Sequence, residues 1–106
     1  MRTALIIPTR NAAPYLDRLL PALAQQTLQP DEFFVVDSQS SDDSVARLRA
    51  AGARVEVIAA TSFNHGGTRQ WASQQVDAEV LIFLTQDAIP CNPDSLANLK
   101  AGLLSE

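Results

Sequence analysis

The chain has 106 residues, the usual size of one domain, and a net charge of -4, which gives no electrostatic surface for nucleic acid or for an anionic membrane. Any anionic ligand must therefore be held locally, by a metal ion, a helix N-terminus or particular arginines. The single cysteine cannot form an internal disulfide and no apolar run approaches the ~20 residues that span a bilayer, so we expect a cytoplasmic protein.

The first predicted unit is a strand followed by a helix. A short apolar run, Ala4 to Ile7, predicts the strand, and Pro8 should close it. Leucines recur on one helical face between Tyr15 and Gln26, with Asn11 as a plausible N-cap and Pro21 expected to kink or shorten the helix. A strand, a tight polar turn and a helix form an anion-binding arrangement, but no glycine-rich dinucleotide loop or P-loop is present.

The second unit places a carboxylate after a strand. Residues 33–36 predict the strand, and Asp37 emerges at its carboxyl end, where open α/β sheets bind ligands. For the later acids, including Asp42, a solvated helix cap is the simpler interpretation. A helix is predicted from Ser44 to Ala51, with Gly52 as its C-terminal stop.

The third unit contains the most unusual loop of the chain. A strand is predicted from Val55 to Ala59 and a helix from Thr68 to Val76, and Gly66 and Gly67 lie between them. Two adjacent glycines let a backbone approach a ligand closely, although a plain turn is the alternative. Arg69 near the helix start opposes the helix dipole, so a nearby anion explains its position better than helix stability does.

The fourth unit is the stretch around which the others are arranged. Five consecutive apolar residues, Val80 to Leu84, predict a strand buried on both faces in the middle of a parallel sheet, and Asp87 follows it. Four strands that alternate with four helices predict an α/β fold with a mainly parallel sheet. Thr9, Asp37 and Asp87 each follow a strand and should converge on one ligand at the same sheet edge.

The last helix is predicted from Pro93 to Leu104, with Asn92 as its cap. Leu96, Leu99 and Leu103 give this helix an apolar face. If that face is exposed, it favours self-association, so a homo-oligomer is among the expected partners.

Four polar stretches carry the chemistry of the chain: Ile6 to Asn11, Val35 to Asp42, Asn64 to Arg69, and Phe83 to Ala88. In this order they resemble the inverting family 2 glycosyltransferases, which have a Rossmann-like GT-A nucleotide-diphospho-sugar-binding fold, and among these the bacterial rhamnosyltransferases. The resemblance covers essentially the whole chain but only the nucleotide-binding half of the family. It therefore implies a single GT-A-like domain over residues 1–106, truncated and without the acceptor-binding part.

The resemblance also implies roles for individual residues. Thr9 and Asp37 correspond to contacts with the nucleobase and ribose, Arg69 to a diphosphate or ribose contact, and Asp87 to the ligand of Mg²⁺ or Mn²⁺. His65 belongs to the same site, with a surface imidazole as an equal alternative. The nucleotide-sugar-binding residues implied in this way are Pro8, Thr9, Arg10, Asn11, Asp37, Ser38, His65, Gly66, Gly67, Arg69, Gln86 and Asp87.

The implied reaction is transfer of a sugar, most simply rhamnose, from a nucleotide-diphospho-sugar to a saccharide or lipid-linked saccharide acceptor in cell-surface polysaccharide synthesis. A metal ion would stabilise the charge on the leaving diphosphate, and the general base is expected downstream of this chain. Two departures from the family are notable. Gln86-Asp87-Ala88 has one carboxylate instead of two, and Ser38 replaces a common aspartate, which favours thymidine-diphosphate-rhamnose over a UDP-sugar.

The resemblance places the protein in the cytoplasm, with peripheral attachment to the inner membrane as an option. A different class of protein is the main alternative: a flavodoxin-like or receiver-like signalling module with Asp37 as phosphoacceptor. Such modules need an acidic pair after the first strand, and this chain has Thr9-Arg10-Asn11 there. An inactive binding fragment is the third possibility.

Overall fold

The computed structural model of the chain describes residues 1–62 and 65–104. Within them, four strands form one parallel sheet in the order β3-β2-β1-β4. The strands are β1 (Thr3–Thr9), β2 (Glu32–Ser38), β3 (Arg54–Ile58) and β4 (Val80–Phe83). The helices are α1 (Ala13–Ala24), α2 (Ser44–Ala50), α3 (His65–Gln74) and α4 (Ser95–Leu104), with a short 3-10 helix at Ala60–Ser62. The predicted alternation of parallel strands and helices is therefore confirmed.

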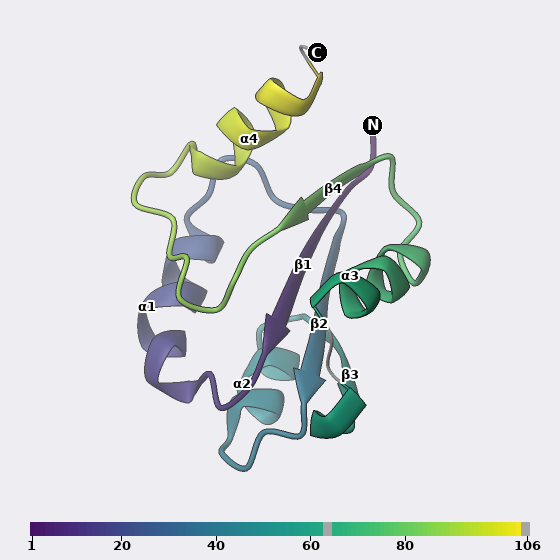
Figure 1. The fold of residues 1–106 in the computed structure, drawn as a ribbon. Helices are drawn as coiled ribbons and strands as arrows, with labels where there is room; N and C mark the ends of the chain where they lie inside the picture. Colours follow the sequence, from purple (N-terminus) through teal and green to yellow (C-terminus); the bar gives the residue numbers. More distant parts are fainter. Residues whose placement is uncertain (63–64, 105–106) are drawn as a thin grey trace.

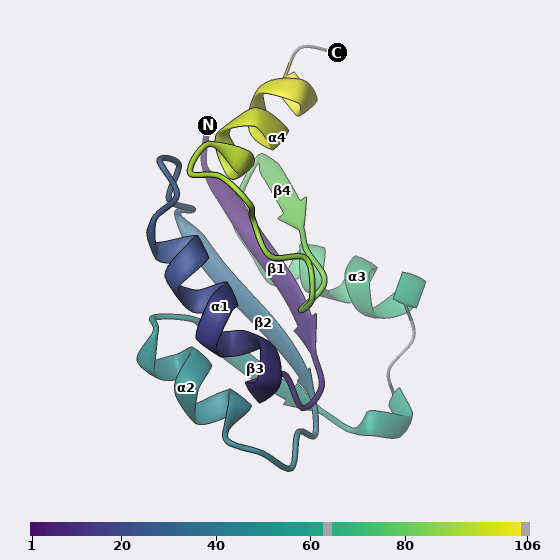
Figure 2. The same ribbon diagram turned by 90° about the vertical axis from the view of Figure 1, so that its left-hand side faces the viewer.

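Helices cover both faces of the sheet, but unequally. Figures 1 and 2 place α1, α2 and α4 against one face and α3 against the other. The larger core lies under the three helices, where Leu16 of α1, Leu48 of α2 and Leu96 of α4 are fully buried. Since side chains alternate along a strand, Ile7 of β1 joins this core and Ile6 joins the opposite one.

The face under α3 holds a smaller core built on an aromatic ring. Phe34 of β2 is buried there beside Ala72 of α3. The ring of Trp71 lies 6.1 Å from the Phe34 ring between centroids, and the Arg54 guanidinium lies 4.4 Å from the Phe34 centroid. In the described residues α3 is the only helix on this face, so the β4 side chains that point this way stay half-buried.

Strand β1 continues through Pro8 to Thr9, two residues beyond the prediction. The Ile6 carbonyl accepts a hydrogen bond from the Leu84 amide at 3.1 Å, so the nitrogen of Pro8, two residues later, also faces the side of β4. The last Cα pair of these strands joins Ile6 and Phe83. Because β4 has already ended there, Pro8 loses no ladder hydrogen bond and does not close the strand.

Strand β4 lies at the edge of the described sheet, whereas its apolar run predicted a central strand. It pairs only with β1, and the central strands are β1 and β2. Val80 and Ile82 are buried, but Leu81 and Phe83 are only half-buried on the α3 side. The prediction of burial on both faces is therefore wrong, because one face has too little cover.

Helix α1 begins without the predicted asparagine cap. Ala12 occupies the N-cap position and makes no side-chain capping bond. Asn11 has a φ of 48°, in the left-handed region that asparagine tolerates better than most residues, and its Oδ1 accepts a bond from the Ser41 amide at 2.7 Å. Pro21 lies inside the helix, which ends at Ala24, about one turn later.

Helix α3 begins earlier than predicted and includes both central glycines. It starts at His65, so Gly66 and Gly67 lie in its first turn and not in an open loop. Each glycine in a helix costs about 1 kcal/mol relative to alanine. The packing of Ala72 against Phe34 favours the helix in spite of this cost. Outside the described residues lie Asn64 of the predicted motif and the side chain of His65.

Helix α4 begins at Ser95 and not at Pro93. Leu96 is 1% exposed, so the prediction of an exposed face is wrong for this residue, whereas Leu99 is 47% exposed. The side chain of Leu103 lies outside the described residues. In the described part of the chain, every helix is too short or too polar to cross a bilayer.

The C-terminal stop predicted for α2 is confirmed at Gly52, which has a φ of 97°. The Gly52 amide donates to the Arg49 carbonyl at 3.0 Å, and the Ala53 amide to the Leu48 carbonyl at 3.1 Å. A Cβ added at Gly52 would meet nothing within 4 Å. Gly52→Ala therefore isolates backbone strain, and we expect it to lower the free energy of unfolding by about 1 kcal/mol in urea denaturation.

Gly102→Ala is the matched control for this substitution. A Cβ at Gly102 also meets open space, but this residue lies inside α4, where alanine is favoured by up to about 1 kcal/mol. We expect the stability of this variant to be equal to or above that of the original chain. Similar losses at both glycines would show that the left-handed backbone of Gly52 is not the cause.

Candidate functional site

The loops that follow β1, β2 and β4 meet at the carboxyl edge of the sheet, at the lower end of the arrows in Figure 1. The chain adds β2 and β3 on one side of β1 and then returns to add β4 on the other side. Ligands of open α/β sheets bind at the carboxyl edge beside such a reversal of strand order. The predicted site residues therefore lie at the position where a ligand is expected.

Asp37 is the buried centre of this edge. It is the second-last residue of β2, opposite Thr9 of β1 in the parallel register, and it is 0% exposed. Its Oδ1 accepts hydrogen bonds from the hydroxyls of Thr9, at 2.7 Å, and Ser40, while its Oδ2 accepts from the Ser40 amide at 2.8 Å. Three donors thus satisfy both oxygens of one carboxylate inside the protein.

A second set of contacts joins the loop after β1 to the loop after β2. The Asn11 amide donates to the Ser40 hydroxyl at 2.8 Å, and the Ser41 amide donates to the Asn11 side chain. Gln39, like Asn11, has a left-handed backbone, with a φ of 49°, and its Oε1 accepts from the Ala60 amide at 2.8 Å. Two strained residues at the ends of adjacent strands are typical of a site whose surroundings fix the backbone.

Asp42 connects the starts of α1 and α2. Its Oδ2 accepts from the Ala13 amide at 3.2 Å, and its Oδ1 accepts from the Ser44 amide at 3.0 Å and from the Ser44 hydroxyl. Burial raises the pKa of the Asp42 carboxyl, but these hydrogen bonds outweigh burial and hold the pKa below its usual 3.8. The stability that they contribute is present above pH 3.8 and is lost as the pH falls through the lowered pKa. Asp42 thus bonds to the first amide of each helix, although the N-cap residue of α2 is Asp43, which makes no side-chain capping bond.

Gln86 connects the loop after β4 to the loop after β1. Its Oε1 accepts from the Arg10 amide at 2.9 Å, and its Nε2 donates to the Arg10 carbonyl at 3.2 Å. The contact joins residues 76 positions apart in the sequence. Because Arg10 follows Thr9, an unbroken series of contacts runs from Asp37 through the β1 loop to the segment that contains Asp87.

Asp87 is exposed to solvent, unlike Asp37. Its Oδ1 accepts a hydrogen bond from the Thr85 hydroxyl at 2.8 Å, and the Ala88 amide closes a turn onto the Thr85 carbonyl at 3.0 Å. Within residues 1–62 and 65–104, no three histidine, cysteine, aspartate or glutamate side chains converge as a metal-binding group. A metal ion at Asp87 would therefore need oxygen ligands from a bound nucleotide and from water.

Arg69 approaches the same edge from the α3 face. Its guanidinium carbon lies 5.8 Å from the centroid of the Phe83 ring, at the last residue of β4. Gly67 lies in the first turn of α3. The structure thus brings Arg69 near β4, but it does not describe the side chain of His65.

Ser38 ends β2 and is buried, at 3% exposed. Its hydroxyl makes no hydrogen bond with the described residues, which is unusual for a buried polar atom. Sequence reasoning named Ser38 but missed Ser40, which binds Asp37 through two atoms. A serine three residues after an aspartate is typical of a side-chain-stabilised turn, and this spacing was the available signal.

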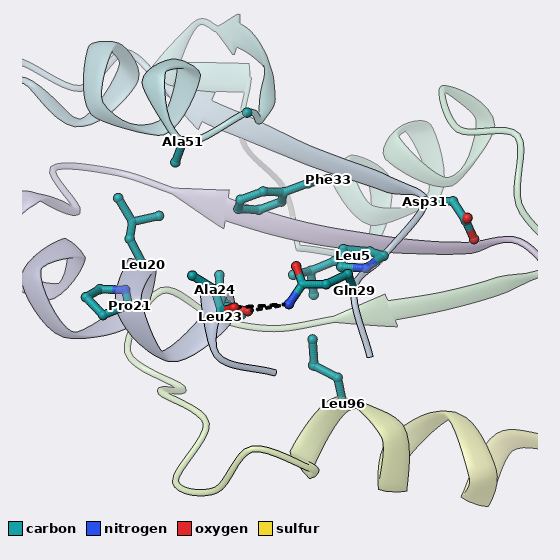
Figure 3. A pocket seen from close by; sticks show the side chains of 12 residues that line it. Leu5, Leu20, Pro21, Leu23, Ala24, Gln29, Asp31, Phe33, Ala51 and Leu96 are labelled. Atoms are coloured by element: carbon teal, nitrogen blue, oxygen red, sulfur yellow. Dashed lines mark hydrogen bonds between the residues drawn. The ribbon is translucent and has the colours of Figure 1, made fainter. Parts of the chain in front are cut away.

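A sizeable cavity lies away from this edge. It has a volume of about 550 Å³ and opens between α1, α4 and the amino ends of the strands, with Leu5, Phe33 and Leu96 among its lining residues (Figure 3). Gln29 also lines it and donates to the Leu23 carbonyl at 3.0 Å (Figure 3). None of the predicted site residues lines this cavity, so it is separate from the site at the carboxyl edge.

Comparison with known proteins finds relatives that match most of the chain. The model of the family described as glycosyl transferase family 2 matches residues 4–103. The O-antigen chain rhamnosyltransferase RfbN of Salmonella typhimurium is 44% identical over 102 residues, which cover 93% of this chain and 32% of that protein.

Two solved structures have the same fold as the chain. S. aureus TarS in complex with UDP-GlcNAc matches with a TM-score of 0.77 and 28% identity, over 99% of this chain and 32% of that chain. The mannosyltransferase PcManGT from Pyrobaculum calidifontis, in complex with GDP-Man and Mn²⁺, matches with a TM-score of 0.74 and 26% identity, over 92% and 30%. The chain thus spans about a third of the length of each of these relatives.

Proposed function

Because the chain belongs to glycosyl transferase family 2, we propose that it is the donor-binding part of an enzyme that transfers a sugar from a nucleotide diphosphate to a saccharide acceptor. The contacts between the three strand-end loops carry this proposal. They gather Thr9, Asp37, Gln86 and Asp87 at the carboxyl edge of the sheet. The general base for the acceptor hydroxyl is expected in a part of the enzyme beyond this chain.

Asp87 is the proposed protein ligand of Mg²⁺ or Mn²⁺. Its carboxylate is exposed, and hard cations accept one protein carboxylate when phosphate oxygens and water complete their shell. The relative PcManGT was solved with Mn²⁺ and a nucleotide sugar. When bound, the ion supplies positive charge that stabilises the leaving nucleoside diphosphate. Arg69, whose guanidinium lies over the Phe83 ring of β4, is the proposed diphosphate contact of the chain itself.

Thr9 and Asp37 are proposed to support the base and ribose end of the donor. The predicted ribose contact of Asp37 stays a prediction, since Thr9 and Ser40 take up its oxygens. Its first role is therefore to hold the loops on which the nucleotide would rest. The nucleotide contact of Ser38 likewise stays a prediction, since its hydroxyl is buried in this structure.

The proposed donor is thymidine-diphosphate-rhamnose, with a UDP-sugar second. Its support is the similarity to a rhamnosyltransferase of O-antigen chains and the serine at position 38. The acceptor would be a saccharide or lipid-linked saccharide of a cell-surface polysaccharide. The proposed location is the cytoplasm, with peripheral attachment to the cytoplasmic face of the inner membrane as an option.

The receiver-like alternative is not favoured. A phosphoacceptor must expose its carboxylate to a phosphodonor, whereas Asp37 is 0% exposed and accepts three hydrogen bonds. The comparisons also match this chain to glycosyltransferases. Asp37 is thus better explained as a structural centre of the site than as a modified residue.

Calorimetric titration with thymidine diphosphate and uridine diphosphate, each with and without Mn²⁺, tests the proposal. We expect binding that Mn²⁺ strengthens about 100-fold, because the ion would bridge Asp87 and the diphosphate, and we expect thymidine diphosphate to bind more tightly. Adenosine diphosphate is the control for diphosphate binding without the correct base. Absence of nucleotide binding to the folded chain in the presence of Mn²⁺ would contradict the proposal.

A further inference from the structure

Gln86 makes an unusual contact for a surface glutamine. Its carboxamide pairs with both the N–H and the C=O of one residue, Arg10, at 2.9 and 3.2 Å. This is the hydrogen-bonding pattern that a neighbouring strand would offer. It occurs just beyond the point where β1 and β4 stop pairing, since the last Cα pair is Ile6 with Phe83. The side chain thus extends the connection between the two strands into their loops.

The contact lies between two groups that the proposed function needs in one place. On one side, Arg10 follows Thr9, whose hydroxyl binds the buried Asp37. On the other side, Gln86 directly precedes Asp87, which is exposed and whose side chain bonds to Thr85, two residues earlier. Within residues 1–62 and 65–104, the only hydrogen bonds between residues 85–88 and the β1 loop are these two, so the carboxamide holds the two groups at a fixed separation.

We propose that Gln86 is a positioning residue that holds Asp87 against the β1 loop, so that a metal ion at Asp87 meets the diphosphate of a nucleotide bound beside Thr9. This inference rests on the proposed function. It deepens that function because it assigns Gln86 a role through Asp87 in place of the direct contact with the nucleotide sugar that the family resemblance implies.

The chemistry of the side chain explains why glutamine suits this position. The contact requires one acceptor and one donor on the same planar group, and a carboxamide has both. A carboxylate of equal length would accept from the Arg10 amide but would bring its second oxygen against the Arg10 carbonyl. An aspartate would also be one methylene shorter. The amide therefore gives up a possible second metal ligand and connects the loops instead.

Two variants separate the two hydrogen bonds of Gln86, the one that its oxygen accepts and the one that its NH₂ group donates. Gln86→Met keeps the length of the side chain and removes both hydrogen bonds, whereas Gln86→Glu keeps the bond from the Arg10 amide and loses the bond to the Arg10 carbonyl. Amide hydrogen exchange, measured by NMR on the nucleotide-free chain, reports the contact directly. We expect Arg10 to exchange at least about tenfold faster in Gln86→Met and to stay protected in Gln86→Glu. The Leu84 amide, which bonds to the Ile6 carbonyl, is the internal control and should not change.

Calorimetry then tests the positioning role. In Gln86→Met we expect the affinity for thymidine diphosphate to fall about tenfold with Mn²⁺ present and to stay within about twofold without it, because only the metal-dependent part requires Asp87 in place. A purely structural role would lower both affinities together. Gln86→Glu, which retains half of the contact, should lie between Gln86→Met and the original chain.

Two results would contradict the positioning role of Gln86, and a third would contradict the proposed function. Unchanged Arg10 exchange in Gln86→Met would overturn the inference, and so would an equal loss of affinity with and without Mn²⁺. If the original chain shows no Mn²⁺-dependent nucleotide binding, the proposed function fails instead. The exchange comparison would still judge the contact of Gln86 in that case, so the two failures are distinguishable.

Discussion

Replacement of Asp37 by alanine is expected to lower the free energy of unfolding by about 3 kcal/mol, a large part of the 5–15 kcal/mol that stabilises a typical domain. The substitution removes a buried carboxylate that accepts three hydrogen bonds. It leaves the Thr9 hydroxyl and two donors of Ser40 without their acceptor, and it opens a small cavity. Urea denaturation followed by circular dichroism measures the loss.

Asp37→Asn is the matched variant for this prediction. The amide has nearly the same shape, its oxygen can accept from the Ser40 amide, and its NH₂ group can donate to the two hydroxyls. We therefore expect a loss of about 1 kcal/mol, well below that of alanine. Asp43→Ala is the control for charge alone, because Asp43 is exposed and makes no side-chain cap at α2. Equal losses at positions 37 and 43 would contradict the central role of Asp37.

The part of the fold that the sequence could predict is the part with a local signal. Apolar runs predicted four strands, and their alternation with helices predicted a parallel sheet, which the register confirms. The same topology predicted that Thr9 and Asp37 would share an edge. They are opposite each other in the β1–β2 register and joined by a hydrogen bond of 2.7 Å. Parallel geometry alone was sufficient for this prediction.

Other features depend on contacts with no local signal. The apolar run of β4 is compatible with a central or an edge position in the sheet. Its side chains determine the hydrophobic pattern, whereas the hydrogen-bonded pairing of its backbone determines its place in the strand order. Asparagine is favoured both at N-caps and in the left-handed region, so Asn11 could not be assigned from its type. The contact of Gln86 with Arg10 spans 76 positions, and only the folded sheet brings the two together.

The second prediction concerns the exposed carboxylate. Asp87→Ala is expected to remove the Mn²⁺-dependent part of thymidine diphosphate binding, a loss of about 100-fold or about 2.7 kcal/mol with the metal present. Asp87 is the proposed protein ligand of the ion, and the described residues hold no cluster of three or more metal-binding side chains that could replace it. Calorimetry at a fixed excess of Mn²⁺ measures the loss, and the same titration with a chelator should give equal affinities for the variant and the original chain.

Asp94→Ala is the matched control for Asp87→Ala. Asp94 is also an exposed acid on the chain between β4 and α4, but its carboxylate accepts from the Thr27 hydroxyl at 2.8 Å, away from the sheet edge. We expect its nucleotide affinity to be unchanged with and without Mn²⁺. A loss at position 94 as large as that at position 87 would mean that general negative charge attracts the ion, and not one positioned ligand.

Asp37→Ala and Asp87→Ala should therefore differ both in the free energy of unfolding and in the Mn²⁺ dependence of nucleotide binding. Asp37→Ala is expected to lower stability and to weaken nucleotide binding whether or not Mn²⁺ is present, because it loosens the loops of β1 and β2. Asp87→Ala should leave the unfolding free energy within about 0.5 kcal/mol of the original, because the side chain is exposed and bonds only to nearby Thr85. Its effect should appear only with the metal. If Asp87→Ala destabilised the fold as much as Asp37→Ala, the exposed carboxylate would be a structural residue and the metal site would have to lie elsewhere.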